Sequence, residues 1–346
     1  MKKNKIIYSL GIHKDGGLII LKMLLNKTDY FFYLDNRLHP SHYSHLKKEN
    51  YIVQKNKFYN LFLNSLNFLR LKENSKIIFL SSSLPLFKLK CIVFALYQNS
   101  NIFYDKNKIK IINWVLSLDF IRFLFFFIFR ENIDQWVVFS NYSKTQLIKK
   151  IRNFPISKIT VLNITQKKLI YNKSKKKIYD FIYPANLMPH KNHNNLFKAF
   201  IILSKKGMRP SLALTLTPNE LKSVKYNLLR KKINLINLYN KNRKIFLNNF
   251  SKCKYLIYPS LNENIGLPLV EAHYLGLEII ASKLDFAKQY DFIDYFFNPL
   301  SPRDIASSAL RILKKKKIKK NLNYNNYNNN SYNNYNNDSI AFTEYF

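Results

Sequence analysis

One stretch decides the fold of this chain: Tyr258-Pro259-Ser260-Leu261-Asn262-Glu263-Asn264-Ile265-Gly266-Leu267-Pro268-Leu269-Val270-Glu271-Ala272. The residues just before Pro259 form a short apolar run, which is typical of a buried strand. Pro268 suits the first turn of a helix, and helical spacing continues to Tyr274. Ligands of such strand–loop–helix units bind beyond the carboxyl ends of the strands, so we expect a ligand site in this loop.

The loop and the start of the helix offer two kinds of contact to a ligand. Backbone N–H groups at a helix N-terminus favour an anion such as a diphosphate. The residues that would present them are Asn264, Ile265, Gly266 and Leu267. Glu263 on the loop and Glu271 in the first helical turn are eight positions apart, so both can accept hydrogen bonds from the hydroxyls of one sugar. Both can equally serve only to cap the helix, and the residues alone leave the two interpretations open.

Short apolar runs alternate with helical segments on both sides of this stretch. In the second half we predict strands at 179–184, 212–216, 233–238 and 278–282, and helices at 194–205, 246–249 and 305–313. In the first half we predict strands at 5–10, 30–34, 76–80, 91–96, 135–140 and 159–162, and helices at 16–25, 58–71 and from 144. Strands that are apolar throughout favour parallel sheets covered on both faces. The sequence therefore predicts two doubly wound α/β units in tandem.

The chain length also favours two domains, because single cores rarely exceed about 300 residues. We place the first domain at 1–165 and the second at 179–315. The basic polar segment 166–178 between them is predicted to be a linker. The segment 316–346 is rich in Lys, Asn and Tyr without a core-forming period, and we predict that it is disordered.

The chain is strongly basic, with 57 Lys plus Arg against 20 Asp plus Glu and a net charge of +37. An anionic membrane surface, nucleic acid or an acidic substrate could each be the partner. Codon bias in an A/T-rich genome is a competing explanation, because it raises Lys without any partner. No module with base-stacking aromatic residues is visible, so nucleic acid is not an expected partner. Cys91 and Cys253 lie in separate apolar runs, and we expect both to be buried and reduced, which indicates a cytoplasmic location.

The segment 120–129 is unusually rich in phenylalanine. It is too short to span a membrane, and Asp119 and Arg122 interrupt the apolar run. Two interpretations remain open: a core helix of the first domain, or a helix that lies on an anionic membrane surface. The second would make the protein peripheral on the inner face of the membrane.

The stretch 258–272 resembles the E-x7-E signature of retaining GT-B glycosyltransferases, especially glycosyltransferase family 4. Gly276 and Ile279-Ile280-Ala281-Ser282 extend the resemblance. It implies that Glu263 contacts the donor sugar near the reacting centre and that Glu271 binds the ribose hydroxyls of the nucleotide.

A second segment, 183–193, resembles the family's first strand–loop–helix of the donor domain. This resemblance places Lys191 at the position of a Lys that binds the donor diphosphate. The family's preceding Arg is replaced by Asn186, so one phosphate charge lacks its usual partner. His190 and His193 can be ordinary surface or helix-start histidines.

Candidate residues of the first domain rest on weaker patterns. Gly16 and Gly17 resemble a glycine-rich loop after the first strand, where the backbone can approach a ligand closely. Gln98 and Asn99 follow a strand where related enzymes carry residues near the acceptor. The resemblance is clear from about 136 to 313.

The resemblance implies a GT-B fold, in which two Rossmann-like parallel-sheet domains face each other across a cleft. It implies retaining transfer of a sugar from a nucleotide-diphosphate donor to a hydroxyl of a glycan or lipid-linked glycan, in surface polysaccharide or lipopolysaccharide assembly. No cofactor is expected, and the sequence has no Asp-x-Asp pair to bind a metal ion. The alternatives are a non-catalytic GT-B protein that binds sugar nucleotide or scaffolds a complex, and a basic nucleic-acid-binding protein.

Overall fold

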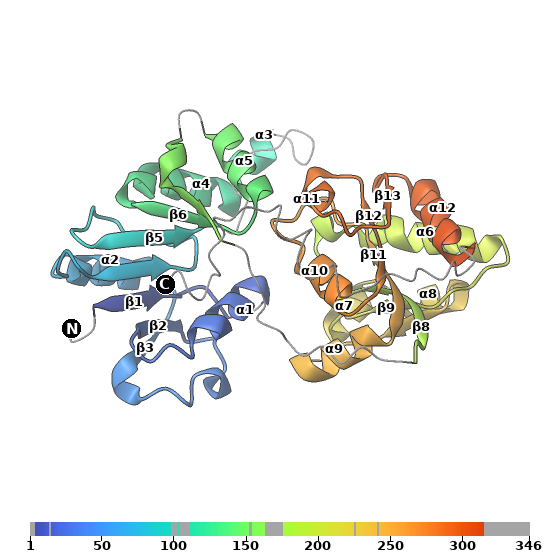
Figure 1. The fold of residues 1–346 in the computed structure, drawn as a ribbon, viewed down its shortest axis with the longest axis horizontal. Helices are drawn as coiled ribbons and strands as arrows, with labels where there is room; N and C mark the ends of the chain where they lie inside the picture. The colour runs from blue at the N-terminus through green and yellow to red at the C-terminus, as the bar shows by residue number, and fades with distance from the viewer. Residues whose placement is uncertain are drawn as a thin grey trace, which may run out of the picture. The chain divides into compact units, whose positions relative to one another are not determined.

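The computed structural model describes residues 4–13, 15–97, 103, 111–151, 154–162, 176–224, 226–240 and 242–314 (Figure 1). These residues form two compact units, one containing the described residues up to 162 and the other those from 176 onward. The segment 316–346 and most of the predicted linker lie outside the described residues.

The first unit is built on a seven-stranded sheet in the order β3-β2-β1-β4-β5-β6-β7, with every neighbouring pair parallel. Its strands are β1 (Lys5–Tyr8), β2 (Phe31–Asp35), β3 (Tyr51–Gln54), β4 (Lys76–Phe79), β5 (Ile92–Leu96), β6 (Gln135–Val138) and β7 (Ile159–Val161). The predicted parallel sheet is confirmed, and the central strands are buried on both faces. The edge strand β3 is not predicted from the sequence, because its apolar run is short and its side chains are partly exposed.

Five α-helices are described in this unit: α1 (Asp15–Leu24), α2 (Phe58–Phe68), α3 (Ile111–Val115), α4 (Leu118–Phe129) and α5 (Asn141–Lys150). The inner sides of α2, α4 and α5 pack into one hydrophobic cluster with the strands. The helices α2, α4 and α5 contribute the buried side chains Phe68, Phe126 and Leu147, in that order, to this cluster. These three helices therefore cover the same face of the sheet.

The Phe-rich segment is α4, and it divides into two sides. Phe126 is buried, with its ring 5.1 Å from that of Trp136 on β6. Ile121, Phe127 and Ile128 are exposed. A core role therefore holds for one side of the helix only. Within the described ranges, no helix has both the length and the apolar character needed to cross a membrane.

The second unit has a six-stranded parallel sheet in the order β10-β9-β8-β11-β12-β13. Its strands are β8 (Tyr179–Tyr183), β9 (Leu212–Leu214), β10 (Leu235–Asn237), β11 (Cys253–Tyr258), β12 (Glu278–Ser282) and β13 (Tyr295–Phe297). Its described helices are α6 (His193–Lys205), α7 (Pro218–Ser223), α8 (Tyr226–Lys232), α9 (Arg243–Ser251), α10 (Leu267–Tyr274), α11 (Asp285–Lys288) and α12 (Pro302–Lys314). In both units the strand order reverses between the first and the fourth strand, which is the doubly wound pattern.

Cys91 and Cys253 are both buried and both free, as predicted. Burial raises the pKa of the Cys91 thiol to about 11. Burial also raises the pKa of the Cys253 thiol, to about 12. Both thiols are therefore protonated at neutral pH and chemically quiet.

Candidate functional site

In the second unit, the strand order reverses between β8 and β11, and the loops that leave these two strands lie together. The N–H of Leu261 donates to the carbonyl of His190 at 2.7 Å. Ser260 Oγ lies 3.3 Å from the same carbonyl oxygen. Open α/β sheets bind their ligands at such reversal points, because the neighbouring loops diverge there and leave a crevice. The structure thus brings the two predicted donor segments to one place.

Asn192 fixes the junction between these loops. Its backbone is left-handed, with φ of 59°, a conformation that Asn tolerates better than most residues. Its side-chain amide donates to the carbonyl of Pro259 at 3.0 Å and to that of Pro299 at 2.7 Å. The ends of three segments are therefore held together by one buried side chain.

Lys191 and Glu263 form an ion pair at this junction. Lys191 Nζ donates to Glu263 Oε1 at 2.5 Å, and the Ser260 hydroxyl donates to the same oxygen at 2.5 Å. The side chains are 17% and 13% exposed, so the pair is largely screened from water but still reaches the surface. The main chain of Lys191 is also fixed, because the buried Tyr183 hydroxyl donates to the Lys191 carbonyl at 2.7 Å. The arrangement presents a fixed ammonium and a fixed carboxylate side by side.

The helix α10 begins directly after this pair, and Gly266 is its N-cap residue. Gly266 has φ of 67°, and an added Cβ would lie 2.9 Å from Cδ1 of Leu269. Both facts require glycine at this position. The Ile265 carbonyl accepts a hydrogen bond from the Tyr290 hydroxyl at 2.6 Å, which fixes the loop before the helix. The predicted anion-binding residues Asn264, Ile265, Gly266 and Leu267 thus lie where the helix begins.

Glu271 is the fifth residue of α10, so its predicted place in the first helical turn is wrong. The reason is that the helix begins one residue before Pro268. Glu271 does not cap the helix either, because α10 has no acidic residue in its first turn and no side-chain cap. Instead its carboxylate is 2% exposed and accepts a hydrogen bond from Nη2 of Arg243 on α9. A buried carboxylate needs such a partner, because burying an unpaired charge is costly.

The replaced Arg position and the two histidines lie on the β8 loop and at the start of α6. Asn186 is half-buried, and its neighbour Leu187 donates its N–H to Glu220 at 2.6 Å. His193 begins α6 and is buried, with its ring 4.8 Å from that of Tyr183. Burial lowers the pKa of His193 to about 4, so the ring is neutral near pH 7. His193 is therefore a core residue at a helix start and not a surface residue.

The first-unit candidates do not assemble into a described cluster. Gly16 and Gly17 lie inside the first turn of α1 rather than in a loop. Gln98 and Asn99 lie outside the described residues. Among the described glycines of the first unit, Gly11 has a positive φ, of 94°.

The N–H of Gly11 donates to the buried carboxylate of Asp35 at 2.7 Å. Burial raises the pKa of Asp35, but hydrogen bonds from Arg37 and Gly11 outweigh it and hold the pKa at about 2. This contact fixes the loop after β1, and it is not predicted from the sequence. Its signal is an acidic residue at the end of the apolar strand β2.

Arg243, Ser260 and Asn192 also escaped prediction, although each contacts a predicted site residue or joins the two loops. Ser260 lies inside the quoted stretch, so its position beside Glu263 could have been noticed. Arg243 is 28 positions from Glu271 and lies in a basic, polar segment that gives no signal.

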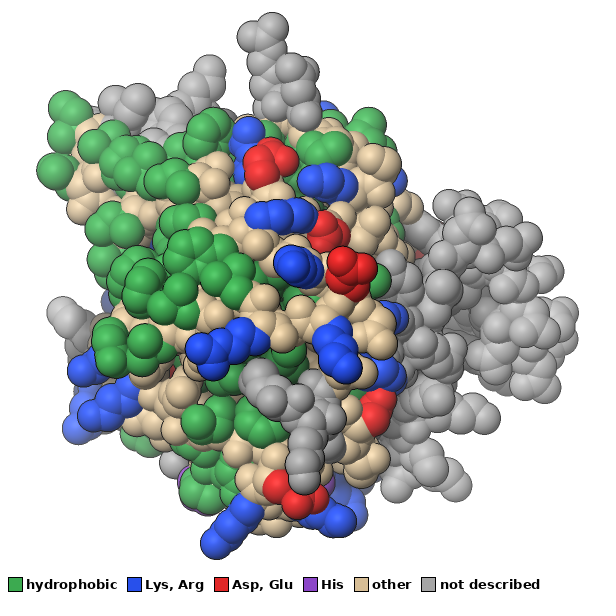
Figure 2. All heavy atoms as spheres, turned by 90° about the vertical axis from the view of Figure 1, so that its left-hand side faces the viewer, with side chains coloured by type: hydrophobic (Ala, Val, Ile, Leu, Met, Phe, Trp, Pro, Cys, Tyr) green, Lys and Arg blue, Asp and Glu red, His purple; other side chains and the backbone are tan. Residues whose placement is uncertain are grey.

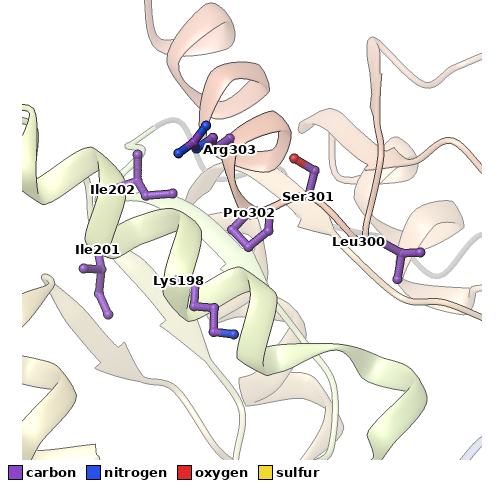
Figure 3. A pocket seen from close by; sticks show the side chains of 7 residues that line it. All are labelled: Lys198, Ile201, Ile202, Leu300, Ser301, Pro302 and Arg303. Atoms are coloured by element: carbon purple, nitrogen blue, oxygen red, sulfur yellow. The ribbon is translucent and has the colours of Figure 1, made fainter.

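A shallow depression of about 530 Å³ lies elsewhere in the second unit, between α6 and the start of α12. Figure 3 shows that side chains of α6, among them Lys198 and Ile202, line it together with Leu300 and Arg303. None of the predicted site residues lines this depression. In the described part of the chain, no three His, Cys, Asp or Glu side chains are grouped closely enough to hold a metal ion.

A known protein family matches a segment that includes the second unit. Residues 163–329 match the family model described as glycosyl transferases group 1. The match includes both loops of the candidate site, with Lys191, Glu263 and Glu271. The comparison with curated proteins gave no match.

Solved structures show the same fold. The apo form of the lipopolysaccharide outer core galactosyltransferase WaaB has a TM-score of 0.58 at 12% identity, covering 89% of this chain and 90% of that chain. A glycosyltransferase from Rickettsia africae ESF-5 has a TM-score of 0.58 at 15% identity, covering 91% and 90%. The pneumococcal O-GlcNAc transferase GtfA, in complex with UDP and GlcNAc, has a TM-score of 0.52 at 16% identity, covering 73% of this chain and 51% of that chain. The predicted fold class, two Rossmann-like parallel-sheet domains of GT-B type, is confirmed.

Proposed function

We propose that the chain is a retaining glycosyltransferase that moves a sugar from a nucleotide-diphosphate donor to an acceptor hydroxyl. The observation that carries the proposal is the contact of Lys191 with Glu263 where the loops after β8 and β11 meet. The match of residues 163–329 to the glycosyl transferases group 1 model supports it.

Lys191 and the start of α10 would act on the leaving group. The barrier to transfer is departure of the diphosphate from an oxocarbenium-like sugar, so positive charge beside the diphosphate lowers it. Lys191 supplies an ammonium group, and the N–H groups at the start of α10 point along a helix axis whose N-terminal end favours anions. The contact with Glu263 keeps the ammonium group in place before the donor binds.

Glu263 would lie near the reacting centre, and Glu271 would accept hydrogen bonds from the ribose hydroxyls. Two features support this division of roles. Glu263 is on the loop beside Lys191 and reaches the surface, whereas Glu271 is deeper, on α10. Arg243 compensates the charge of Glu271, so that a buried carboxylate can remain ionised and serve as an acceptor.

The donor-side charge described above supports transfer without a metal ion or cofactor, and this is part of the proposal. We propose that the acceptor is a glycan or a lipid-linked glycan intermediate in surface polysaccharide or lipopolysaccharide assembly. WaaB, which shares the fold, is a lipopolysaccharide galactosyltransferase. The two buried thiols support a reducing compartment such as the cytoplasm.

One observation favours a second candidate function. Asn186 stands where the resembled family carries an arginine, so the donor diphosphate would meet one positive charge fewer. A non-catalytic GT-B protein that binds sugar nucleotide, or scaffolds a complex, would tolerate this loss.

Two experiments in sequence test the proposal. A thermal shift screen with nucleotide sugars that differ in base and sugar identifies the donor as the compound that raises the melting temperature. NMR of the product made from that donor and a panel of glycan acceptors then reports the anomeric configuration. Retention of the donor's configuration supports the proposal, inversion overturns the retaining mechanism, and binding without transfer favours the non-catalytic candidate.

A further inference from the structure

Exposed large apolar side chains are concentrated in the first unit. Of the 23 found among the described residues, 18 lie in this unit and five lie in the second. The two units share a doubly wound parallel-sheet fold, so the fold itself does not require this difference. Surface apolar residues that gather in one place mark interaction sites more often than scattered ones.

Two parts of the first unit carry most of these side chains: the outward side of α2, and the outward side of α3 and α4. Phe58 and Tyr59 at the start of α2 are 65% and 67% exposed. On α4, Leu118, Ile121 and Ile128 are 69%, 61% and 64% exposed. We call these outward sides together the apolar face.

The two parts belong to one surface. The inner sides of α2 and α4 pack into the same buried cluster, so both helices cover one face of the sheet. The loop between β4 and β5 joins them: the N–H of Leu86 donates to the Ser65 hydroxyl on α2 at 3.3 Å, and the Pro85 carbonyl accepts from Asn132, just after α4, at 2.9 Å. Figure 2 shows hydrophobic side chains gathered down one side of this unit, with Lys and Arg and some Asp and Glu side chains beside them.

The charges around the α2 part of the apolar face are mainly positive. The helix α2 has no charged residue of its own, and exposed basic residues flank it. They are Lys55, Lys57, Arg70 and Lys72. On α4 and directly after it, Asp119 pairs with Arg122 at 2.7 Å and Glu131 pairs with Arg130 at 3.2 Å, so this part of the face is close to neutral and mainly apolar. An apolar side with basic flanks is the pattern of helices that lie in the interface of an anionic bilayer.

We infer that the apolar face docks reversibly on an anionic lipid bilayer. The exposed side chains of α2, α3 and α4 enter the boundary between head groups and acyl chains, and the flanking Lys and Arg meet the lipid phosphates. A second copy of this chain is the less favoured occupant, because it would bring two sets of like charges together. This inference goes beyond the proposed function and does not depend on it.

Sedimentation of the full chain with lipid vesicles tests the inference. Vesicles of equal parts phosphatidylcholine and phosphatidylglycerol are expected to bind the chain at least about tenfold more tightly than vesicles of phosphatidylcholine alone. Binding to the anionic vesicles should fall sharply between about 50 mM and about 500 mM salt, because added salt shortens the distance over which the charges attract each other.

Paired substitutions test which surface binds. Ile121→Ser with Ile128→Ser, and separately Phe58→Ser with Tyr59→Ser, should each weaken binding to the anionic vesicles at least about tenfold. The matched control is Ile178→Ser with Leu300→Ser in the second unit, where the side chains are 52% and 69% exposed, and it should bind like the wild type. Phe126 is unsuitable for substitution because it is buried. Circular dichroism and thermal unfolding should match the wild type for all three variants.

Three results would overturn the inference. The first is a folded wild-type chain that does not sediment with anionic vesicles at low salt. The second is equal binding by the apolar-face variants and the control. The third is a wild-type dimer in sedimentation velocity that the Ile121→Ser, Ile128→Ser pair abolishes without affecting vesicle binding, since the face would then join two copies of the chain.

Discussion

Lys191 Nζ lies 2.5 Å from Glu263 Oε1, although the two residues are 72 positions apart in the sequence. Each comes from the loop after a different strand, and the reversal of strand order between β8 and β11 is what brings the loops together. Ser260, whose hydroxyl also donates to Glu263 Oε1, lies beside the carbonyl of His190 and so joins the same loops a second time. The proposed donor site therefore depends on the topology of the sheet as much as on the side chains.

Replacing Lys191 should impair turnover. Lys191→Met removes the positively charged side chain that we propose to contact the donor diphosphate, and we expect kcat/KM to fall roughly 10²–10³-fold. Lys191→Arg keeps the charge and should recover part of the loss. Lys205→Met, at the exposed end of α6, is the control and should leave the kinetics unchanged. Equal kinetics for Lys191→Met and the control would remove Lys191 from the site.

Replacing Arg243 should affect both stability and donor binding. Arg243→Ala leaves the buried Glu271 carboxylate without this partner, and we expect the free energy of unfolding to fall by about 1–3 kcal/mol. Donor affinity should weaken by about tenfold, because Glu271 loses its fixed orientation. Chemical denaturation and titration calorimetry measure the two effects, with Arg209→Ala as an exposed control.

The double variant Arg243→Ala with Glu271→Gln sharpens this test. Glutamine removes the charge that Arg243 no longer compensates, so part of the stability should return while donor affinity stays low. If Arg243→Ala alone leaves both stability and affinity at wild-type values, the pair has no role in this site.

His193 should make the fold sensitive to acid. Burial is the main reason that its pKa is lowered from 6.5 to about 4, so the unfolded chain takes up the proton at a higher pH than the folded chain. The stability that His193 contributes is thus fully present above the unfolded pKa and is lost as pH falls toward about 4. The loss is on the order of 3 kcal/mol over the whole window.

His193→Phe removes the proton and keeps the ring among its aromatic neighbours. The variant should lose less free energy of unfolding than the wild type when the pH changes from about 7 to about 5. Parallel pH profiles for His193→Phe and the wild type would contradict the prediction.

The two thiols should be unreactive in the folded protein. Cys91 is 2% exposed and Cys253 is fully buried, and burial raises the pKa of both. With Ellman's reagent at about pH 8 we expect no rapid reaction of the native chain, because the reagent needs an accessible thiolate. Denaturation in guanidinium should release both thiols. One equivalent of rapid reaction without denaturant would show that one of the two is accessible.

The sequence predicts the buried central strands and the two loops of the candidate site well, because buried parallel strands are apolar throughout and the loop residues lie at their ends. It misses β3 and β13, which are short and partly exposed. It misplaces Glu271, since the helix start is set by the left-handed Gly266 and not by Pro268. It cannot predict the partner of Glu271, because α9 and α10 contact each other only once the sheet has formed. It also leaves the Phe-rich segment undecided, because Phe126 and Phe127 are the same residue type, yet the first is buried and the second is exposed.

The central claim is that Glu263 and Lys191 form the centre of a sugar-transfer site, and the rate of nucleoside diphosphate release tests it most directly. The rate is measured with the donor found by thermal shift and with acceptor present, for the wild type and for Glu263→Gln, which keeps the shape but removes the charge. We expect the wild type to release nucleoside diphosphate in step with product, and Glu263→Gln to be at least about 10²-fold slower with nearly unchanged donor affinity. Equal rates for the two proteins, or donor binding by the wild type without any release, would contradict the claim.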